Sequence, residues 1–145
     1  MDLVKILIFM VIAAVSGIAS LQDIKWRKVH NLVIFSGIFA VFLINLVLNR
    51  GFLIESLLSA FIYFMFYFIG KLIVKGKFGN ADLYFGIFQG LCLPIKMLPL
   101  CVLLETVLAY FFILIFKKRM KDNPLPFIPF MATSLIICNF LQLVI

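Results

Sequence analysis

Short polar segments break the chain into six apolar stretches, and this pattern restricts its fold more than any other feature of the sequence. A helix that crosses a bilayer needs about 20 mostly apolar residues. Because 66% of the 145 residues are hydrophobic and 13% are charged, the chain holds more apolar side chain than a soluble core could bury. We therefore expect an all-α, polytopic membrane protein with one transmembrane domain over residues 1–145. The expected helices cover residues 3–22, 31–48, 52–73, 81–93, 98–116 and 127–144.

Lys and Arg residues are concentrated in alternate connections between these stretches. If the first helix runs inward, the inner loops hold ten of the 13 basic residues, and the outer segments hold Lys5, Arg50 and Lys96. Since an excess of basic residues marks the cytoplasmic side, we expect a multi-pass protein of the cytoplasmic (inner) membrane with both termini outside. The net charge of +7 then reflects orientation and contact with acidic membrane lipids, and no nucleic-acid partner is expected.

Asp23 and Asp82 stand at the ends of two apolar stretches, both on the expected inner side. A carboxylate at the edge of a span is costly, so each is a functional-site hypothesis. Two facing carboxylates share one proton. The ionised one can take a proton from water while the protonated one donates to a carbonyl, which hydrolyses a peptide without a metal or cofactor. Because such a pair titrates as a unit, neither residue is assigned as acid or base.

The alternative for these two aspartates is structural, with each one capping a helix or pairing with a nearby lysine. Asp82, at the start of the fourth expected helix, would suit an N-cap. Asp23, at the C-terminal end of the first expected helix, opposes the helix dipole. The structural reading is therefore weaker for Asp23 than for Asp82.

The string DIKWRKVHN at residues 23–31 resembles the first signature region of type IV prepilin peptidases, which are intramembrane aspartyl proteases. That region has an Asp-x-basic pattern followed by an aliphatic residue, proline and asparagine. The matching residues are Asp23, Lys25, Val29 and Asn31, and His30 stands in place of the proline.

The string GNADLYF at 79–85 is similar to the family's second region, Gly-x-Gly-Asp. Gly79 and Asp82 match, and Ala81 replaces the second glycine. A PFIPF segment at 126–130 is similar to a proline-rich stretch at the same place in the family. The resemblance extends over nearly the whole chain by helix count and motif order.

The resemblance implies an aspartic endopeptidase that cuts the short basic leader from prepilin-like proteins of the type IV pilus kind, beside their hydrophobic helix at the cytoplasmic face. It implies catalysis by Asp23 and Asp82, and substrate contacts from Gly79, Ala81, Asn31 and Lys25. Larger members carry an inserted domain with paired cysteines that is linked to methylation of the product. Because Cys92, Cys101 and Cys138 form no C-x-x-C pair, we expect a compact form that cleaves without methylation. No metal site is expected, since the chain has a single histidine and lacks an H-E-x-x-H motif.

Two other functions remain open at this point. A small transporter or channel component could use Asp23, Asp82 and Glu105 as a proton or cation path, and would place polar residues through the depth of several helices. A non-catalytic membrane scaffold is the other alternative. Glu105 lies mid-span, and we expect it to hydrogen-bond Thr106, Gln89 or another buried polar group. The i, i+4 spacing of Gly86 and Gly90 predicts a close-packing face on the fourth helix.

Overall fold

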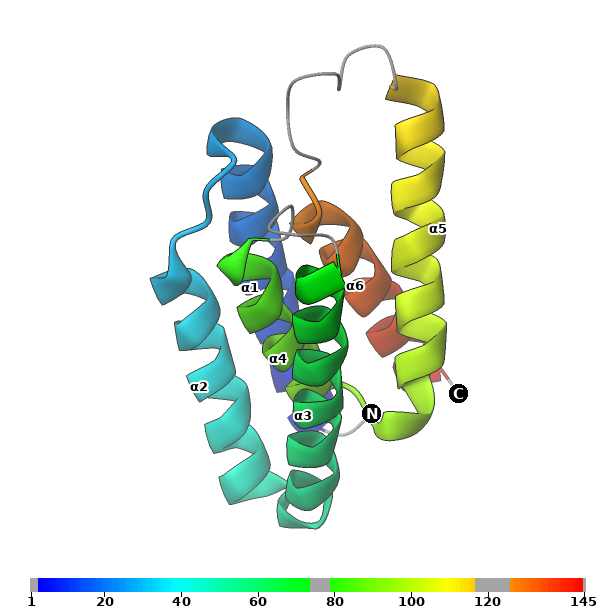
Figure 1. Cartoon of the computed structure of the whole chain (residues 1–145). Coiled ribbons are helices and arrows are strands. Elements are labelled where there is room, and N and C mark those ends of the chain that lie inside the picture. The colour runs from blue at the N-terminus through cyan, green and yellow to red at the C-terminus, as the bar shows by residue number, and fades with distance from the viewer. Residues whose placement is uncertain (1–2, 74–78, 117–125, 145) are drawn as a thin grey trace.

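The computed structural model describes residues 3–73, 79–116 and 126–144, and it shows an all-helical protein over these ranges (Figure 1). This confirms the predicted fold class. The helices, in chain order, are α1 (Leu3–Trp26), α2 (Asn31–Leu48), α3 (Arg50–Ile73), α4 (Asn80–Cys92), the short 3-10 helix η1 (Ile95–Met97), α5 (Leu98–Phe116) and α6 (Ile128–Val144).

Most helix boundaries agree with the prediction to within two residues, but α1 is longer than expected. It continues past Gln22 to Trp26, so Asp23 lies inside its last turn. The helix ends where Arg27 adopts a positive φ of 54° and its N–H donates to the carbonyl of Asp23 at 3.0 Å. A residue in the left-handed region with this hydrogen bond is a common C-terminal cap. Helix α1 therefore presents the Asp23 side chain from a defined turn rather than from a loop.

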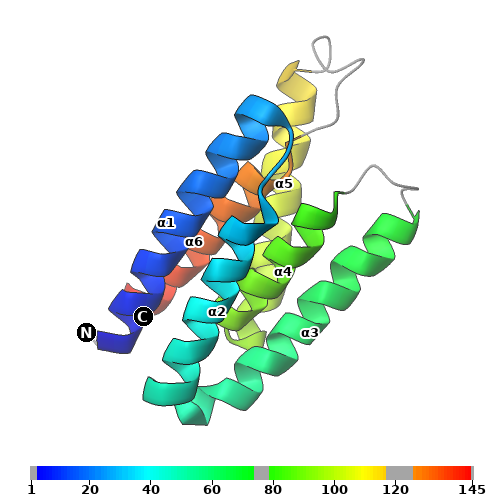
Figure 2. The same cartoon turned by 90° about the vertical axis from the view of Figure 1, so that its left-hand side faces the viewer.

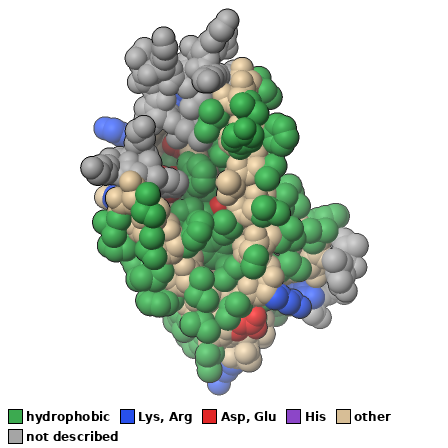
Figure 3. Space-filling model, turned by 45° about the vertical axis from the view of Figure 1, so that its right-hand side comes forward, with side chains coloured by type: hydrophobic (Ala, Val, Ile, Leu, Met, Phe, Trp, Pro, Cys, Tyr) green, Lys and Arg blue, Asp and Glu red, His purple; other side chains and the backbone are tan. Residues whose placement is uncertain are grey.

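Four helical segments are long and apolar enough to cross a membrane: α1, α2, α3 and residues 95–115, with α6 as a shorter apolar helix. Their outer surfaces expose large hydrophobic side chains, and the space-filling view shows a largely hydrophobic face (Figure 3). These features fit a multi-pass membrane protein, in which lipid covers the apolar exterior.

Helix α4 lies at the centre of the bundle, with most of its residues buried. It packs against α3, α2 and α6, while α5 packs mainly on α6 at the periphery (Figures 1 and 2). The predicted glycine face is confirmed, since a Cβ on Gly86 would lie 2.5 Å from the Tyr67 ring and one on Gly90 would lie 2.3 Å from the Ala60 Cα. Small residues thus let α4 approach α3 at backbone contact distance.

The two ends of the helix bundle carry different parts of the chain. The end of α1 and the beginnings of α4 and α6 lie together at one end, whereas both chain termini lie at the other (Figures 1 and 2). The first end carries Asp23 and Asp82, and it is called the aspartate end below. The second is called the terminal end. The two acidic residues thus reach the same level of the bundle, as the sequence predicted.

Candidate active site

Asp82 is held at the first turn of α4 by a backbone amide. The helix has Gly79 as its N-cap, and the Oδ2 atom of Asp82 accepts a hydrogen bond from the Gly79 N–H at 2.8 Å. Asp82 therefore caps the helix start, as the structural alternative expected, but from the third helical position of a capping box and not as the N-cap residue itself. Its side chain is 8% exposed. A carboxylate in this position satisfies one of the unpaired N–H groups of a helix start and complements the helix dipole.

Asp23 is held in a related way, but by a different helix. Its Oδ2 atom accepts a hydrogen bond from the backbone N–H of Ile128 at 3.2 Å, and Ile128 is the first residue of α6. Pro129 follows in the first turn, where its missing N–H costs nothing. Although Asp23 opposes the dipole of α1, it complements the dipole of α6. The proline-containing segment at 126–130 thus delivers a helix start to Asp23.

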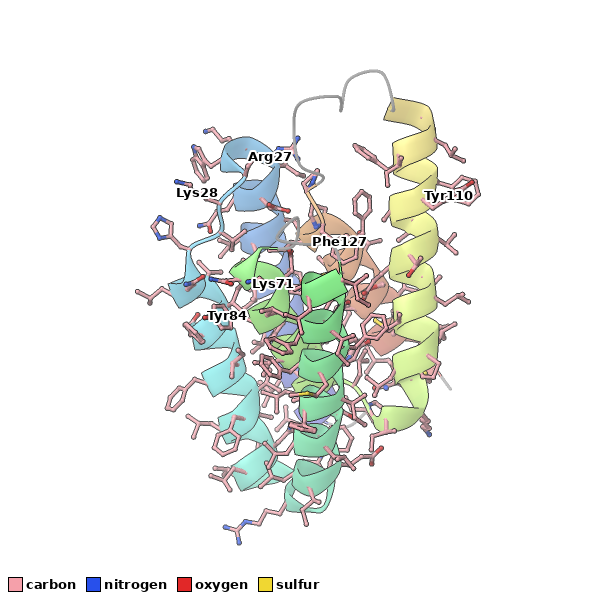
Figure 4. All side chains as sticks on the ribbon, viewed as in Figure 1. Arg27, Lys28, Lys71, Tyr84, Tyr110 and Phe127 are labelled. Carbon is pink, nitrogen blue, oxygen red and sulfur yellow. The ribbon has the colours of Figure 1, made fainter. Side chains whose placement is uncertain are left out.

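The two carboxyl groups share one electrostatic environment. The charges that act on Asp82 include those of Asp23 and Lys71, and Arg27 acts on Asp23. Figure 4 shows Arg27, Lys71 and Phe127 at the aspartate end, contributed by the α1 terminus, α3 and the start of α6. When two carboxylates lie close together, ionisation of one disfavours ionisation of the other. The site thus has the elements of paired acid–base chemistry.

A hydrogen bond between side chains joins α3 to α4 beside Asp82. The Lys71 ammonium donates to the Oδ1 atom of Asn80, and Asn80 is the first residue of α4. The contact fixes a positive charge close to the Asp82 carboxyl. The basic, glycine-containing loop predicted at 71–79 begins in α3, and its residues 74–78 lie outside the described part of the chain.

The structure brings some of the other predicted site residues to the aspartates and leaves others apart. Gly79 contacts Asp82 directly, and Ala81 lies between them in sequence with its side chain packed against the core. Lys25 lies over the Trp26 ring, 4.9 Å from its centroid. Asn31 is exposed at the start of α2. Among the described residues, the hydrogen bonds of the two aspartates include neither Lys25 nor Asn31.

His30, which replaces the proline of the first signature, has a local structural role. It is the N-cap residue of α2, and its backbone N–H donates to the Oε1 atom of Gln22 at 3.0 Å. This hydrogen bond ties the start of α2 back to α1. Proline has no N–H to donate, so the histidine provides a contact that the usual residue could not.

A second polar centre surrounds Glu105, whose side chain is 1% exposed. The predicted partner Gln89 donates to its Oε1 atom at 2.6 Å, whereas Thr106 donates to the carbonyl of Val102 in its own helix. Further donors come from three side chains on α3, α5 and α6, namely Tyr67, Cys101 and Ser134. The carboxyl of Glu105 thus connects four helices.

Sequence reasoning missed three contributors to this arrangement: the Ile128 amide, Tyr67 and the Lys71–Asn80 pair. The only sequence signal for the first was the PFIPF segment, which indicated a helix start without a partner. Tyr67 lies within an aromatic-rich stretch, and nothing in its local sequence distinguishes it from the neighbouring aromatic residues. In the structure its hydroxyl donates to Glu105 and its ring lies against Phe127, with centroids 6.3 Å apart.

Within the described ranges, no three His, Cys, Asp or Glu residues lie close enough to hold a metal ion. The three cysteines are all buried.

The fold and the site define a polytopic helical membrane protein with two aspartates from α1 and α4 at one end of the bundle. The chain belongs to the type IV leader peptidase family, whose model matches residues 9–114. The matched range contains both aspartates and ends before α6. No curated protein and no solved structure matches the chain significantly.

Proposed function

We propose that the chain is an intramembrane aspartyl endopeptidase that cuts the short basic leader from prepilin-like proteins, using Asp23 and Asp82. The observation that carries the proposal is the convergence of these two carboxyls, from α1 and α4, on one end of the bundle within electrostatic reach of each other. Membership of the leader peptidase family supports the substrate class. Residues 1–145 act as a single peptidase domain, with the aspartate end at the cytoplasmic face and both termini outside.

The reaction follows from a pair of carboxyls that holds one proton. The ionised carboxyl takes a proton from a water molecule while the oxygen of that water bonds to the scissile carbonyl carbon. The protonated carboxyl donates its proton to the carbonyl oxygen. When the resulting tetrahedral species breaks, the C–N bond opens, the amine leaves with a proton, and the carboxyl pair returns to its starting state. No cofactor enters this sequence.

The surroundings of Asp82 favour the approach of an extended substrate backbone. Gly79 and Asn80 are exposed, and a Cβ on Gly79 would lie 3.5 Å from the Oδ2 atom of Asp82. A larger side chain at this position would therefore extend from a point already in contact with the carboxyl. In this proposal the small residues Gly79 and Ala81 leave room for the substrate backbone beside Asp82, and Lys25 and Asn31 contact the substrate further from the carboxyls.

One polar feature bears on the transport alternative. The Glu105 centre lies at mid-depth, but its oxygens accept hydrogen bonds from four side chains. A carboxyl enclosed in this way resembles a structural network more than a site that exchanges ions. The peptidase proposal therefore accounts better for the position of the two aspartates, and Glu105 is assigned to stability.

The decisive experiment measures cleavage of a tagged prepilin-like substrate that is co-reconstituted with the protein in membranes. Asp23→Asn and Asp82→Asn, tested separately, are expected to lower the rate by at least about 100-fold. Thr106→Val is a matched control, because this exposed side chain bonds only its own helix in the described structure. Membrane abundance must be equal for all variants. Retention of cleavage in both asparagine variants would refute the proposal.

A further inference from the structure

The contact between Lys71 and Asn80 connects the end of α3 to the start of α4 at the aspartate end. Lys71 lies in the last turn of α3, and its ammonium donates to the Oδ1 atom of Asn80, the first residue of α4. Figure 4 shows Lys71 beside the start of α4. Because the two residues stand nine positions apart, at either end of the connection between the helices, the contact holds the start of α4 directly against α3.

The start of α4 is also the part of the chain that orients Asp82. Gly79 precedes Asn80 as the N-cap residue, and its N–H donates to the Oδ2 atom of the Asp82 carboxyl at 2.8 Å. Asn80 thus lies in the chain between the donor and the acceptor of this hydrogen bond. A displacement of Asn80 would move both groups, so the Lys71–Asn80 contact supports the orientation of the carboxyl through the backbone.

Lys71 brings a positive charge as well as a contact. Its side chain is half-buried, so water and salt screen the charge less than they would on the surface. A lysine in the last turn of a helix complements the helix dipole, which favours an ammonium at the end of α3. The charge of Lys71 acts on Asp82, and an ammonium near a carboxyl favours the ionised form of that carboxyl.

Few other ionisable groups face Asp82. Helices α2 and α6, which pack against α4, contain no charged residue. Helix α3 also contributes Tyr67, whose hydroxyl donates to Glu105, and α1 contributes Asp23, whose charge opposes the ionisation of Asp82. Among the residues that the structure describes, Lys71 is the cation whose charge acts on the Asp82 carboxyl.

We infer that Lys71 is a positioning residue of the candidate active site: it holds the start of α4 through Asn80, and its ammonium sets the pH at which the carboxyl pair loses its first proton. The inference rests on the proposed function, because the hydrolysis proposed above needs a pair that holds one proton. With the ammonium in place, the pair reaches this state at a lower pH. Without it, both carboxyls stay protonated to a higher pH, and neither can take a proton from water.

The first test measures protonation without cleavage. A hydrophobic carbodiimide adds to the protonated form of a carboxyl, and mass spectrometry of the purified full-length protein in detergent measures the modified fraction of Asp82. In the wild type this fraction should fall as the pH rises. In Lys71→Gln the midpoint of the fall should lie about 1 pH unit higher. Lys71→Arg keeps a positive charge and a donor, so its midpoint should stay within about 0.3 unit of wild type.

Two further variants separate the charge from the contact. Lys28→Gln is the matched control, because Lys28 is an exposed lysine at the same end of the bundle (Figure 4) and is not among the charges described as acting on Asp82. It should shift the midpoint by less than about 0.3 unit. Asn80→Ala keeps every charge but removes the acceptor of the Lys71 ammonium. It should raise the midpoint by about 0.5 unit, since the ammonium is then no longer held near Asp82.

The second test measures cleavage of the tagged substrate against pH for the same variants. Lys71→Gln should lower kcat/KM mainly on the acidic side of the profile, by about tenfold where both carboxyls are protonated in the variant. The loss should appear in kcat rather than in KM, because Lys71 acts on the carboxyl and not on the substrate.

Three outcomes would overturn the inference. The first is an unchanged labelling midpoint in Lys71→Gln, and the second is an equal shift in Lys71→Gln and Lys28→Gln. The third is a raised KM without any change in the pH profile, which would make Lys71 a substrate contact. Because labelling does not depend on cleavage, the two proposals can fail separately. If the midpoint shifts as expected while Asp23→Asn and Asp82→Asn both retain cleavage, the peptidase proposal is wrong and the effect of Lys71 on Asp82 is confirmed.

Discussion

The carboxylate of Asp23 accepts a hydrogen bond from the backbone N–H of Ile128, 105 positions further along the chain, at 3.2 Å. The contact joins the last turn of α1 to the first turn of α6. It gives one side chain two functions, because the same carboxyl that caps α6 also interacts with Asp82. Loss of cleavage on replacing Asp23 could therefore reflect lost chemistry or a lost cap, and the two must be separated.

A pair of substitutions at Asp23 separates these functions. In Asp23→Asn the amide oxygen can still accept the Ile128 N–H, so the thermal stability should stay within about 0.5 kcal/mol of wild type while cleavage is lost. Asp23→Leu removes the acceptor and should cost about 1 kcal/mol more. Thermal unfolding in detergent measures both. Equal destabilisation of the two variants would show that the Ile128 hydrogen bond contributes nothing to stability.

Hydropathy and charge predict the helices and their depth because each of these depends on local sequence. Hydropathy and charge placed Asp23 and Asp82 at one end of the bundle, because the depth of each aspartate follows from the point where an apolar stretch ends. The spacing of Gly86 and Gly90 predicted a packing face for the same reason, and the structure identifies the α3 residues opposite, Tyr67 and Ala60. Gln89 was a correct partner for Glu105, because few other polar residues are available at mid-depth.

The contacts between helices could not be derived in the same way. A hydropathy pattern does not say which helices are neighbours or how each one is rotated about its axis. The Asp23–Ile128 hydrogen bond and the Tyr67–Glu105 hydrogen bond both depend on that information.

A single methyl group added at Gly90 is predicted to push α4 away from α3. A Cβ there would meet the backbone of Ala60 at 2.3 Å, and backbone cannot move aside as a side chain can. Gly90→Ala should destabilise the protein by about 1–3 kcal/mol. Gly17→Ala is the matched control, because a Cβ at this α1 position meets nothing within 4 Å. This control should be neutral or stabilising by about 0.5–1 kcal/mol.

Thermal unfolding of these two alanine variants in the same detergent provides the comparison. The same substitution is predicted to lower stability at Gly90 and not to lower it at Gly17. If Gly90→Ala were as stable as Gly17→Ala, the close approach of α3 and α4 at Ala60 would be wrong.

The Glu105 centre is predicted to stabilise the bundle through Tyr67. Tyr67→Phe leaves Glu105 without one of its donors and should cost about 1–3 kcal/mol. Tyr110→Phe removes the same hydroxyl from a tyrosine on α5 that is 60% exposed (Figure 4), and should change stability by less than about 0.5 kcal/mol. Chemical or thermal unfolding in detergent measures both variants.

A double-mutant cycle tests whether Tyr67 acts through Glu105. Tyr67→Phe and Glu105→Gln are expected to couple by about 0.5–3 kcal/mol, because the two residues share a hydrogen bond. If the stability changes of the two single variants simply added in the double variant, the stabilising hydrogen bond between Tyr67 and Glu105 would be contradicted. Because Tyr67 also packs against Phe127, the residue before Ile128, Tyr67→Phe should leave that ring contact unchanged and cleavage close to wild type.

Arg27 is predicted to carry backbone strain at the end of α1. Its φ of 54° lies in the left-handed region, which costs a residue with a Cβ about 1 kcal/mol relative to glycine. Because Arg27 also acts on Asp23 through its charge, the comparison must hold the charge constant. Arg27→Gly and Arg27→Ala both remove the guanidinium, but only the glycine variant relieves the strain. Thermal unfolding in detergent should therefore find Arg27→Gly more stable than Arg27→Ala by about 1 kcal/mol, and an alanine variant of equal or greater stability would show that the left-handed cap is not strained.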